Sequence, residues 1–392
     1  MITDEFASIQ KRIHDYGFKR LLLAVSGGLD SICLAHYFIC NKEALGIEWL
    51  GIAHVHHGLR VGTADRDAAF VEAFAKTHNI PFFLKKLDGE ALKNAEGSLE
   101  ENARDARYKA LAEITQDDSF LPHKTSFLKG SVATDLIPHT SLVIVTAHHA
   151  GDQAETMYMR LRRGTTLAGL RGIQETRELF DVECEMWNEK EITTHYAPHI
   201  THFIYRPLLN TSRAELIAYA KENNLEWCED ESNSDVKFAR NKVRHEFLPL
   251  LEKECPGAAQ QLCRIALLAD KTYAKVMNAS ESIFAPVLKA GNADADIRQH
   301  DMRAGIALDK KRLRKVLREH ACADLSEMFR LWLSEQGFRF PIGFFYDQKE
   351  PTHVKIPVRA AYRKRSIVKN GSTVFICEFE SVEAALKFVS CK

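Results

Sequence analysis

At residues 21–31 the chain reads Leu21-Leu22-Leu23-Ala24-Val25-Ser26-Gly27-Gly28-Leu29-Asp30-Ser31. An apolar run that ends in glycines is typical of a buried, parallel strand. A helix-like sequence follows at 32–38. The glycines allow a tight turn that brings backbone N–H groups close to an anion, and the N-terminus of the following helix adds a partial positive charge. We therefore predict a strand, a phosphate-binding loop and a helix, in that order.

The carboxylate of Asp30 indicates that a cation belongs to this loop. A carboxylate beside a phosphate would repel it, unless Mg²⁺, which takes carboxylate and phosphate oxygens, lies between them. The loop lacks the Gly-x-x-x-x-Gly-Lys-Ser/Thr pattern of the Walker type. We predict that Asp30 holds Mg²⁺ through a bound nucleotide, and that the phosphates contact Ser26, Gly27, Gly28, Leu29, Asp30 and Ser31.

The composition is that of a globular protein with more than one domain. The 392 residues are 45% hydrophobic and 27% charged, and a chain of this length exceeds one compact core. No apolar run approaches the roughly 18 residues of a membrane span, and the first residues lack a basic secretory start, so we expect a cytoplasmic protein. The nine cysteines form no Cys-x-x-Cys pair, which indicates reduced thiols.

Basic residues gather late in the chain, although its net charge is zero. Runs rich in lysine and arginine lie at 237–245, 309–318 and 355–369. One such run is typical of a solvated face. Three of them beyond the nucleotide loop indicate a surface for a nucleic-acid backbone.

Strand-like and helix-like segments alternate through the first half, which predicts an α/β fold with a doubly wound parallel sheet. We expect strands at 49–54, 81–87 and 141–146, helices at 65–78, 99–115 and 152–163, a loop insertion at 117–140 and an irregular hairpin at 178–205. Helices are expected at 213–223, 244–255, 258–284, 302–319 and 325–336, with strands at 354–362 and 373–379. We predict a catalytic domain at 1–213, a helical domain at 214–348 and a short strand-containing domain at 349–392.

A second chemical motif spans 146–156, where a predicted strand meets a predicted helix. His148 and Asp152 lie four residues apart across this junction and could converge on one phosphate or metal ion. In the plainer interpretation Asp152 caps the helix and His148 fills a loop position. The histidines of the chain, namely His54, His56, His57, His148 and His149, also raise the question of zinc, but no spacing matches a tetrahedral site, so we do not expect one.

The predicted helix at 99–115 places Arg104, Arg107 and Tyr108 on one face. Two guanidinium groups on one face can hold a triphosphate, or can pair with the acidic residues of the same helix. The sequence decides neither this question nor which arginine would contact the phosphates.

The string at 26–31 resembles the signature of the N-type ATP pyrophosphatases, or PP-loop family, whose members cleave ATP between the α and β phosphates and adenylate a carbonyl oxygen. The motifs at 54–60, 101–108, 147–156, 206–208, 230–233 and 240–244 look like those of the tRNA(Ile)-lysidine synthetase family. Together the motifs cover residues 21 to about 251. The resemblance implies a ligase that joins free L-lysine to C2 of the wobble cytidine of CAU-anticodon tRNA(Ile). AMP and pyrophosphate would be released, and codon reading would change from AUG to AUA.

The same resemblance implies roles for individual residues, with ATP and Mg²⁺ as cofactors. It places Asp30, Arg107, His148 and Asp152 in catalysis and His54 and Arg104 beside the nucleotide. It places the tRNA on the 214–348 domain and on Arg206, Arg240, Asn241 and Arg244. The lysine pocket stays open between Glu155, Asp230 and Glu231, and a homodimer is common on this scaffold. Gly151 stands where many relatives have aspartate.

Three alternatives remain. A tRNA thiolase also adenylates a base carbonyl, but such enzymes generally rely on cysteine pairs or an iron–sulfur cluster. A glutamine-dependent amide ligase would need an amidotransferase domain, and residues 1–16 form only a short helix. A tRNA-binding protein with an inactive nucleotide loop is the third alternative, and the intact Ser26, Asp30 and Arg107 argue against it.

Overall fold

The computed structural model describes residues 2–59, 62–115, 142–179, 202–229, 239–288, 302–319, 325–336, 338, 340, 359–362, 365–370 and 373–379. The chain divides into two compact units: residues 1–165 with 169–267, and residues 166–168 with 268–392. The boundary between them lies within helix α11 (Ala258–Phe284). The domain division at 213 and 348 stays a prediction. No helix of the described residues is long and apolar enough to cross a membrane.

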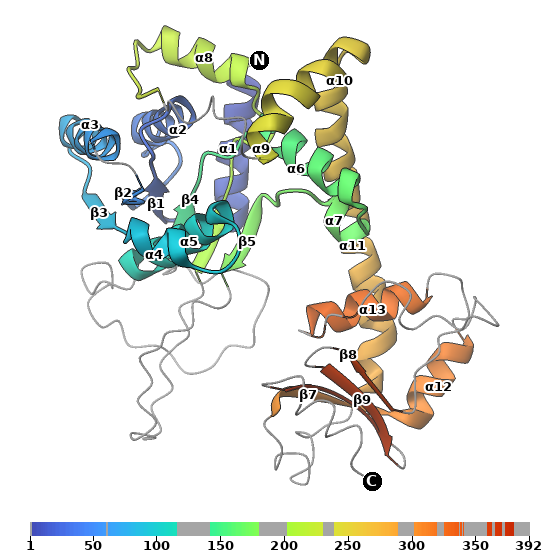
Figure 1. Cartoon of the computed structure of the whole chain (residues 1–392). Coiled ribbons are helices and arrows are strands. Elements are labelled where there is room, and N and C mark those ends of the chain that lie inside the picture. The colour runs from blue at the N-terminus through green and yellow to red at the C-terminus, as the bar shows by residue number, and fades with distance from the viewer. Residues whose placement is uncertain are drawn as a thin grey trace, which may run out of the picture. The chain divides into compact units, whose positions relative to one another are not determined.

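The first unit is built on a six-stranded sheet in the order β3-β2-β1-β4-β6-β5 (Figure 1). Neighbouring strands are parallel except for β5, which pairs antiparallel with β6 at the edge. The predicted doubly wound α/β fold is confirmed, and its connections change direction between β1 and β4. The strands are β1 (Arg20–Ala24), β2 (Trp49–His56), β3 (Phe82–Lys86), β4 (Leu142–Val145), β5 (Thr176–Leu179) and β6 (His202–Tyr205).

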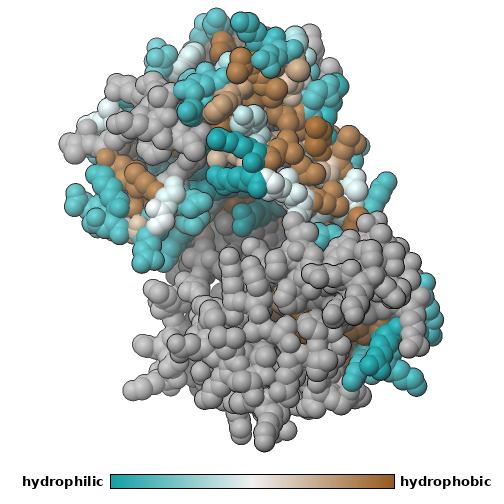
Figure 2. Space-filling view, turned by 45° about the vertical axis from the view of Figure 1, so that its right-hand side comes forward, coloured by the Kyte–Doolittle hydropathy of each residue, from teal (hydrophilic) through white to brown (hydrophobic). Residues whose placement is uncertain are grey.

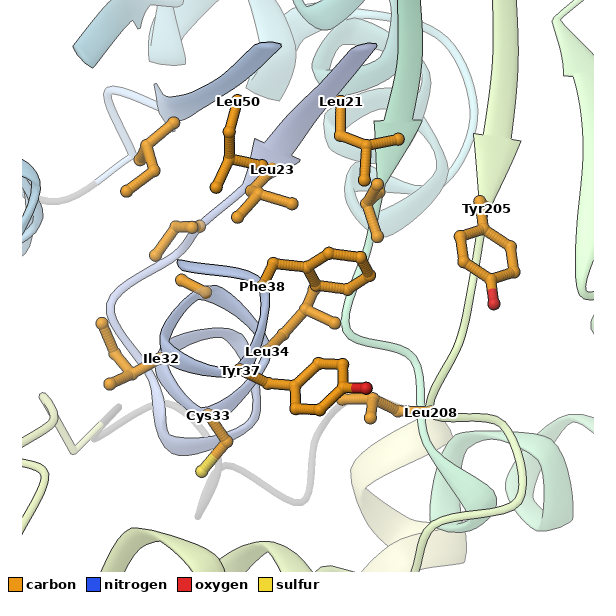
Figure 3. Close-up of a cluster of buried hydrophobic side chains, with 14 of the residues drawn as sticks. Leu21, Leu23, Ile32, Cys33, Leu34, Tyr37, Phe38, Leu50, Tyr205 and Leu208 are labelled. Atoms are coloured by element: carbon orange, nitrogen blue, oxygen red, sulfur yellow. The ribbon is translucent and has the colours of Figure 1, made fainter. Parts of the chain in front are cut away.

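Helices cover both faces of this sheet because its central strand is apolar on both faces. On one face, Leu21 and Leu23 of β1 pack with Phe38 of α2 (Figure 3). On the other face, Leu22 packs with Leu111 of α5. The unit contains α1 (Ile2–Tyr16), α2 (Leu29–Cys40), α3 (Thr63–Thr77), α4 (Gly89–Asn94), α5 (Leu99–Thr115), α6 (Ala150–Arg163), α8 (Arg213–Glu222), α9 (Ala239–Lys242) and α10 (Leu248–Glu254).

The second unit contains a four-stranded antiparallel sheet in the order β7-β10-β9-β8. Phe284, Phe329 and Trp332 form its core with Ile367 and Ile376 of the sheet. Its elements are β7 (Met302–Asp309), α12 (Lys310–Glu319), α13 (Leu325–Glu335), β8 (Arg359–Tyr362), β9 (Arg365–Asn370) and β10 (Thr373–Phe379).

One secondary-structure prediction in this unit is wrong. A single helix is predicted at 302–319, but its first half is strand β7 and only Lys310–Glu319 is helical. The strand forms because Ala307 and Leu308 pair with Phe375 and Val374 of β10, far away in sequence. The predicted loop at 117–140 and most of the predicted hairpin at 178–205 lie outside the described residues, although the ends of the hairpin pair as β5 and β6.

Candidate active site

A cavity of about 600 Å³ lies at the carboxyl ends of β1, β2 and β4. Ser26, Asp30 and Ser31 line it from the segment after β1, and His148 lines it from the loop after β4. These two strands are neighbours at the point where the connections of the sheet change direction. Open α/β sheets bind their ligands at this switch point. We therefore assign the cavity as the candidate active site.

The loop after β1 is held by the hydroxyl group of Ser31. The backbone N–H of Ser26 donates to Ser31 Oγ at 3.2 Å, and Ser31 Oγ donates to the carbonyl oxygen of Gly28 at 2.9 Å. Gly27 has a φ of 95°, in the left-handed region that favours glycine. Gly28 precedes α2 and no side chain caps that helix. The first turn of α2 therefore presents backbone N–H groups suited to an anion.

Asp30 lies in this first turn and fits the predicted Mg²⁺ ion. Its Oδ2 is 3.7 Å from His149 Nε2 and 3.6 Å from Arg213 Nη1. Its Oδ1 is buried without a hydrogen-bond partner. Burial raises the pKa of Asp30, and the charges of His149 and Arg213 act in the opposite direction. A buried, unsatisfied carboxylate oxygen is costly, and it is the ligand type that Mg²⁺ prefers.

His149, which received no role from the sequence, contacts both predicted catalytic aspartates. It caps α6: its Nδ1 accepts the N–H of Gly151 at 3.0 Å, and its own N–H donates to Asp152 Oδ2 at 3.0 Å. Because Nδ1 accepts a hydrogen bond, the ring proton of neutral His149 lies on Nε2. That nitrogen is 3.7 Å from Asp30 Oδ2 and 3.6 Å from Asp152 Oδ2. The only signal in the sequence is that His149 lies in the motif at 146–156, shortly before the predicted helix at 152–163.

Gly151 gives His149 the space for this position. A Cβ atom at Gly151 would lie 2.6 Å from His149 Cε1. Gly151→Ala is therefore expected to displace the imidazole, to lose a helix cap worth about 1 kcal/mol, and to lower kcat. Urea unfolding measures the loss of capping energy, and steady-state kinetics measure kcat. In a His149→Ala background, Gly151→Ala should lower the free energy of unfolding only slightly. An equal loss of unfolding free energy in both backgrounds would argue against the contact between Gly151 and His149.

Arg240 and Arg244 lie on another wall of the cavity, paired with two carboxylates of α6. Arg240 Nε donates to Glu155 Oε2 at 2.7 Å and its Nη2 donates to Asp152 Oδ1 at 3.0 Å. Arg244 donates to the same two side chains. Only 3% of the Glu155 side chain is exposed. Asn241 also lines the cavity. The tRNA contacts of these three residues stay predictions.

Glu155 was one of the open candidates for the lysine pocket, and the structure surrounds its carboxylate with two guanidinium groups. An ammonium group would have to displace one of them. The other two candidates, Asp230 and Glu231, lie outside the described residues.

His148 is neutral at ordinary pH. Burial lowers its pKa to about 3, Asp152 opposes this shift, and the charges of Arg206 and Arg107 add to it. Its Nδ1 lies 2.9 Å from Thr146 Oγ1. A neutral imidazole can exchange hydrogen bonds with a substrate but adds no positive charge.

The two arginines of α5 differ in position. Arg107 lines the cavity, whereas Arg104 is not among its lining residues. The guanidinium carbon of Arg107 lies 5.5 Å from the centre of the Tyr108 ring, and that of Arg104 lies 5.9 Å from it. This placement favours Arg107 for the phosphate contact, and Arg104 stays a prediction.

Arg206 lies in the interior of the unit. It is 2% exposed, and its Nη1 donates to the carbonyl oxygen of Gln174 at 2.7 Å. Its charge helps to lower the pKa of Tyr108, against the raising effect of burial. The burial of Arg206 favours a role in positioning Tyr108 and the segment at Gln174 over the predicted tRNA contact.

Histidines at the end of β2 lie next to the segment that leads into the phosphate loop. His54 Nδ1 donates to the carbonyl oxygen of Val25 at 2.8 Å, and burial lowers its pKa. His57 also lines the cavity, and its Nδ1 is buried without a hydrogen-bond partner. The sequence places His57 within the motif at 54–60 and among possible zinc ligands but gives it no individual role in the site.

His57 predicts a loss of stability in acid. Burial and the nearby Arg107 lower its pKa from 6.5 to about 4. Below pH 6.5 the unfolded chain binds a proton that folded His57 refuses, so stability falls as the pH drops toward 4. The unfolding free energy of the parent should fall between about pH 7 and pH 5. In His57→Gln this fall should be smaller by about 1–2 kcal/mol. Urea titrations test this, with the exposed His14→Gln as control, and equal losses in parent and His57→Gln would refute it.

The site residues described above all lie within the region that matches one known protein family. The PP-loop domain family matches residues 2–122 and 131–251. The chain belongs to the PP-loop family. Two curated relatives show how much of a longer protein this chain matches. A tRNA(Ile)-lysidine synthase of Haemophilus ducreyi is 30% identical over 329 residues, covering 84% of this chain and 60% of the relative. A tRNA(Ile)-lysidine synthase of Streptococcus equi subsp. zooepidemicus is 34% identical over 262 residues, covering 67% of this chain and 48% of the relative.

These relatives confirm the resemblance of this PP-loop protein to the tRNA(Ile)-lysidine synthetases. The chain spans about 60% of the length of the first relatives that it matches. Among solved structures, a U34-tRNA thiolase from Methanococcus maripaludis is 15% identical with a TM-score of 0.45, covering 68% of this chain and 80% of the thiolase.

Proposed function

We propose that this PP-loop protein is a tRNA(Ile)-lysidine synthase. It would use ATP and free L-lysine to convert the wobble cytidine of CAU-anticodon tRNA(Ile) to lysidine. The observation that carries the proposal is one cavity that joins the uncapped N-terminus of α2, the unsatisfied Asp30 and the guanidinium of Arg107. The names of the relatives supply the substrate class.

In the first step, the C2 carbonyl oxygen of the cytidine attacks the α-phosphorus of ATP. The bond between the α-phosphorus and the bridging oxygen breaks, and pyrophosphate leaves with the electron pair. Negative charge grows on the phosphates, and preorganised donors in a cavity stabilise such charge. The N–H groups of α2 and Arg107 are placed for this task. Mg²⁺, when held by Asp30, would supply further neutralisation of the phosphate charge.

In the second step, the ε-amine of lysine attacks C2. The bond between C2 and the oxygen of AMP breaks, AMP leaves with that electron pair, and the attacking neutral amine loses one proton to solvent. Asp152 and neutral His148 face the cavity and could orient the base through hydrogen bonds. The base must leave its stack to enter, which costs little in an anticodon loop because its nucleotides are unpaired.

The products of ATP cleavage test the reaction class. Purified protein with ATP, Mg²⁺, lysine and CAU-anticodon tRNA(Ile) should form AMP and pyrophosphate in equal amounts, and only when the tRNA is present. ADP and inorganic phosphate as products would refute the proposal. The oligomeric state in the same solution, measured by sedimentation, tests the expectation of a homodimer.

A further inference from the structure

A group of aromatic and cationic side chains lies outside the cavity, between the end of α6 and the turn that follows α9. It consists of Tyr158, Arg162, Lys242 and Phe247, here called the outer shelf. Tyr158 and Phe247 stack with ring centres 5.6 Å apart and planes at 21°. Arg162 Cζ lies 5.5 Å and Lys242 Nζ lies 5.8 Å from the centre of the Phe247 ring. One ring therefore positions two positive charges.

The two cations of the outer shelf remain accessible to an anion. Arg162 and Lys242 are exposed, and both rings are half-buried. Lys242 lies 3.8 Å from Glu246, in a surface pair of the kind that contributes little. Within the described part of the chain, no carboxylate forms a salt bridge with Arg162. Contact with a ring orients a cation without neutralising it, so the outer shelf keeps its positive charge.

A π-helical turn at Val243–Phe247 lies between the cavity-lining Arg240 and the end of the outer shelf at Phe247. Arg240 and Arg244 line the cavity and pair with Glu155 of α6, whereas Phe247 packs on Tyr158, further along the same helix and outside the cavity lining. Such turns are rare and are frequent at functional sites.

We propose that the outer shelf binds an unpaired nucleotide next to the one that enters the cavity. Its phosphate would contact Arg162 and Lys242, and its base would pack on the exposed part of the Tyr158–Phe247 pair. Aromatic side chains beside cations are the usual surface for single-stranded nucleic acid. The nucleotide belongs to the anticodon loop, so this inference rests on the proposed function. Lys242 directly follows Arg240 and Asn241, which both line the cavity, and this position suits a flanking nucleotide.

Exposed apolar side chains lie in the neighbouring helices and raise the alternative of a protein contact. Leu250 of α10 and Ile265 and Leu267 of α11 are 54%, 42% and 48% exposed. Figure 2 shows apolar surface gathered in the upper part of the molecule, bordered by hydrophilic side chains. The two cations of the outer shelf, Arg162 and Lys242, favour a polyanion over an apolar protein surface as the partner of the outer shelf.

The test measures RNA binding by fluorescence anisotropy with two probes: the CAU anticodon stem–loop, and a blunt duplex of the same stem. The variants are Phe247→Leu, which keeps an apolar side chain, and Arg162→Gln. Lys253→Gln on the exposed face of α10 is the control. Melting temperatures establish that each variant is folded.

Phe247→Leu should weaken stem–loop binding by about 5- to 100-fold, as expected for loss of a stacking contact, and leave duplex binding unchanged. Arg162→Gln should weaken stem–loop binding and reduce its salt slope by about 1. Lys253→Gln should bind both RNAs like the parent.

Parental stem–loop affinity in Phe247→Leu and Arg162→Gln would overturn the proposal, as would an equal loss for loop and duplex. A change in sedimentation with unchanged RNA binding would instead assign the outer shelf to a protein contact. The proposed function is judged separately. If the parent binds the loop but never incorporates lysine, that function fails, whereas selective loss of loop binding in the variants still supports the outer shelf.

Discussion

Asp30→Asn is expected to reduce tRNA-dependent pyrophosphate release by at least about 100-fold, the scale found when a charge-stabilising group is removed from an active site. Asparagine has nearly the same shape as aspartate but carries no charge, so it would bind Mg²⁺ poorly. Because Asp30 Oδ1 is buried without a partner in the folded protein, the substitution should not lower the melting temperature. RNA affinity should stay within about 2-fold, since the tRNA contacts predicted here lie on other residues.

A matched control for this variant is Asp15→Asn, because the Asp15 side chain is 56% exposed on α1. It should release pyrophosphate at the parental rate. Initial rates at saturating ATP and tRNA measure both variants. A parental rate in Asp30→Asn would show that the carboxylate has no part in the chemistry.

Glu155→Gln is expected to lower stability and activity together. The buried carboxylate of Glu155 receives hydrogen bonds from Arg240 and Arg244. Without its charge, both guanidinium groups depend on Asp152, and breaking such a buried pair costs about 3 kcal/mol. Arg240 and Arg244 are 23% and 31% exposed, so water moderates this cost. Activity should fall at least about tenfold, because Asp152 would be drawn away from His149.

Urea unfolding and steady-state kinetics measure these two effects. Arg244→Met in the Glu155→Gln background should recover part of the lost stability, because it removes one of the two positive charges that then share the single carboxylate of Asp152. A loss below about 0.5 kcal/mol for Glu155→Gln, the scale of an ordinary surface substitution, would mean that solvent already screens the network.

The sequence predicted the parts of the site that depend on local order. The apolar run at Leu21–Leu23 and the glycines after it correctly indicate strand, loop and helix. The alternation of elements correctly predicts the sheet, and the cavity brings Asp30, Arg107, His148 and Asp152 to one place. Their catalytic roles stay predictions until a variant is measured.

Contacts between distant segments could not be predicted in this way. The pairing of Glu155 with Arg240 joins residues 85 positions apart, and no local pattern encodes it. Strand β7 forms only because β10 offers it a partner. The buried guanidinium of Arg206 donates to the carbonyl oxygen of Gln174, which lies in a separate segment of the chain. The contact of His149 with both aspartates depends on the missing Cβ of Gly151, which becomes apparent only in three dimensions.

One measurement tests the central claim most directly: incubation of the purified protein with ATP, Mg²⁺, labelled L-lysine and unmodified CAU-anticodon tRNA(Ile). We expect label in the tRNA, with one AMP and one pyrophosphate released for each lysine incorporated. ATP consumption that depends on tRNA but leaves all label in free lysine would contradict the claim, and would assign the cavity to adenylation before another nucleophile.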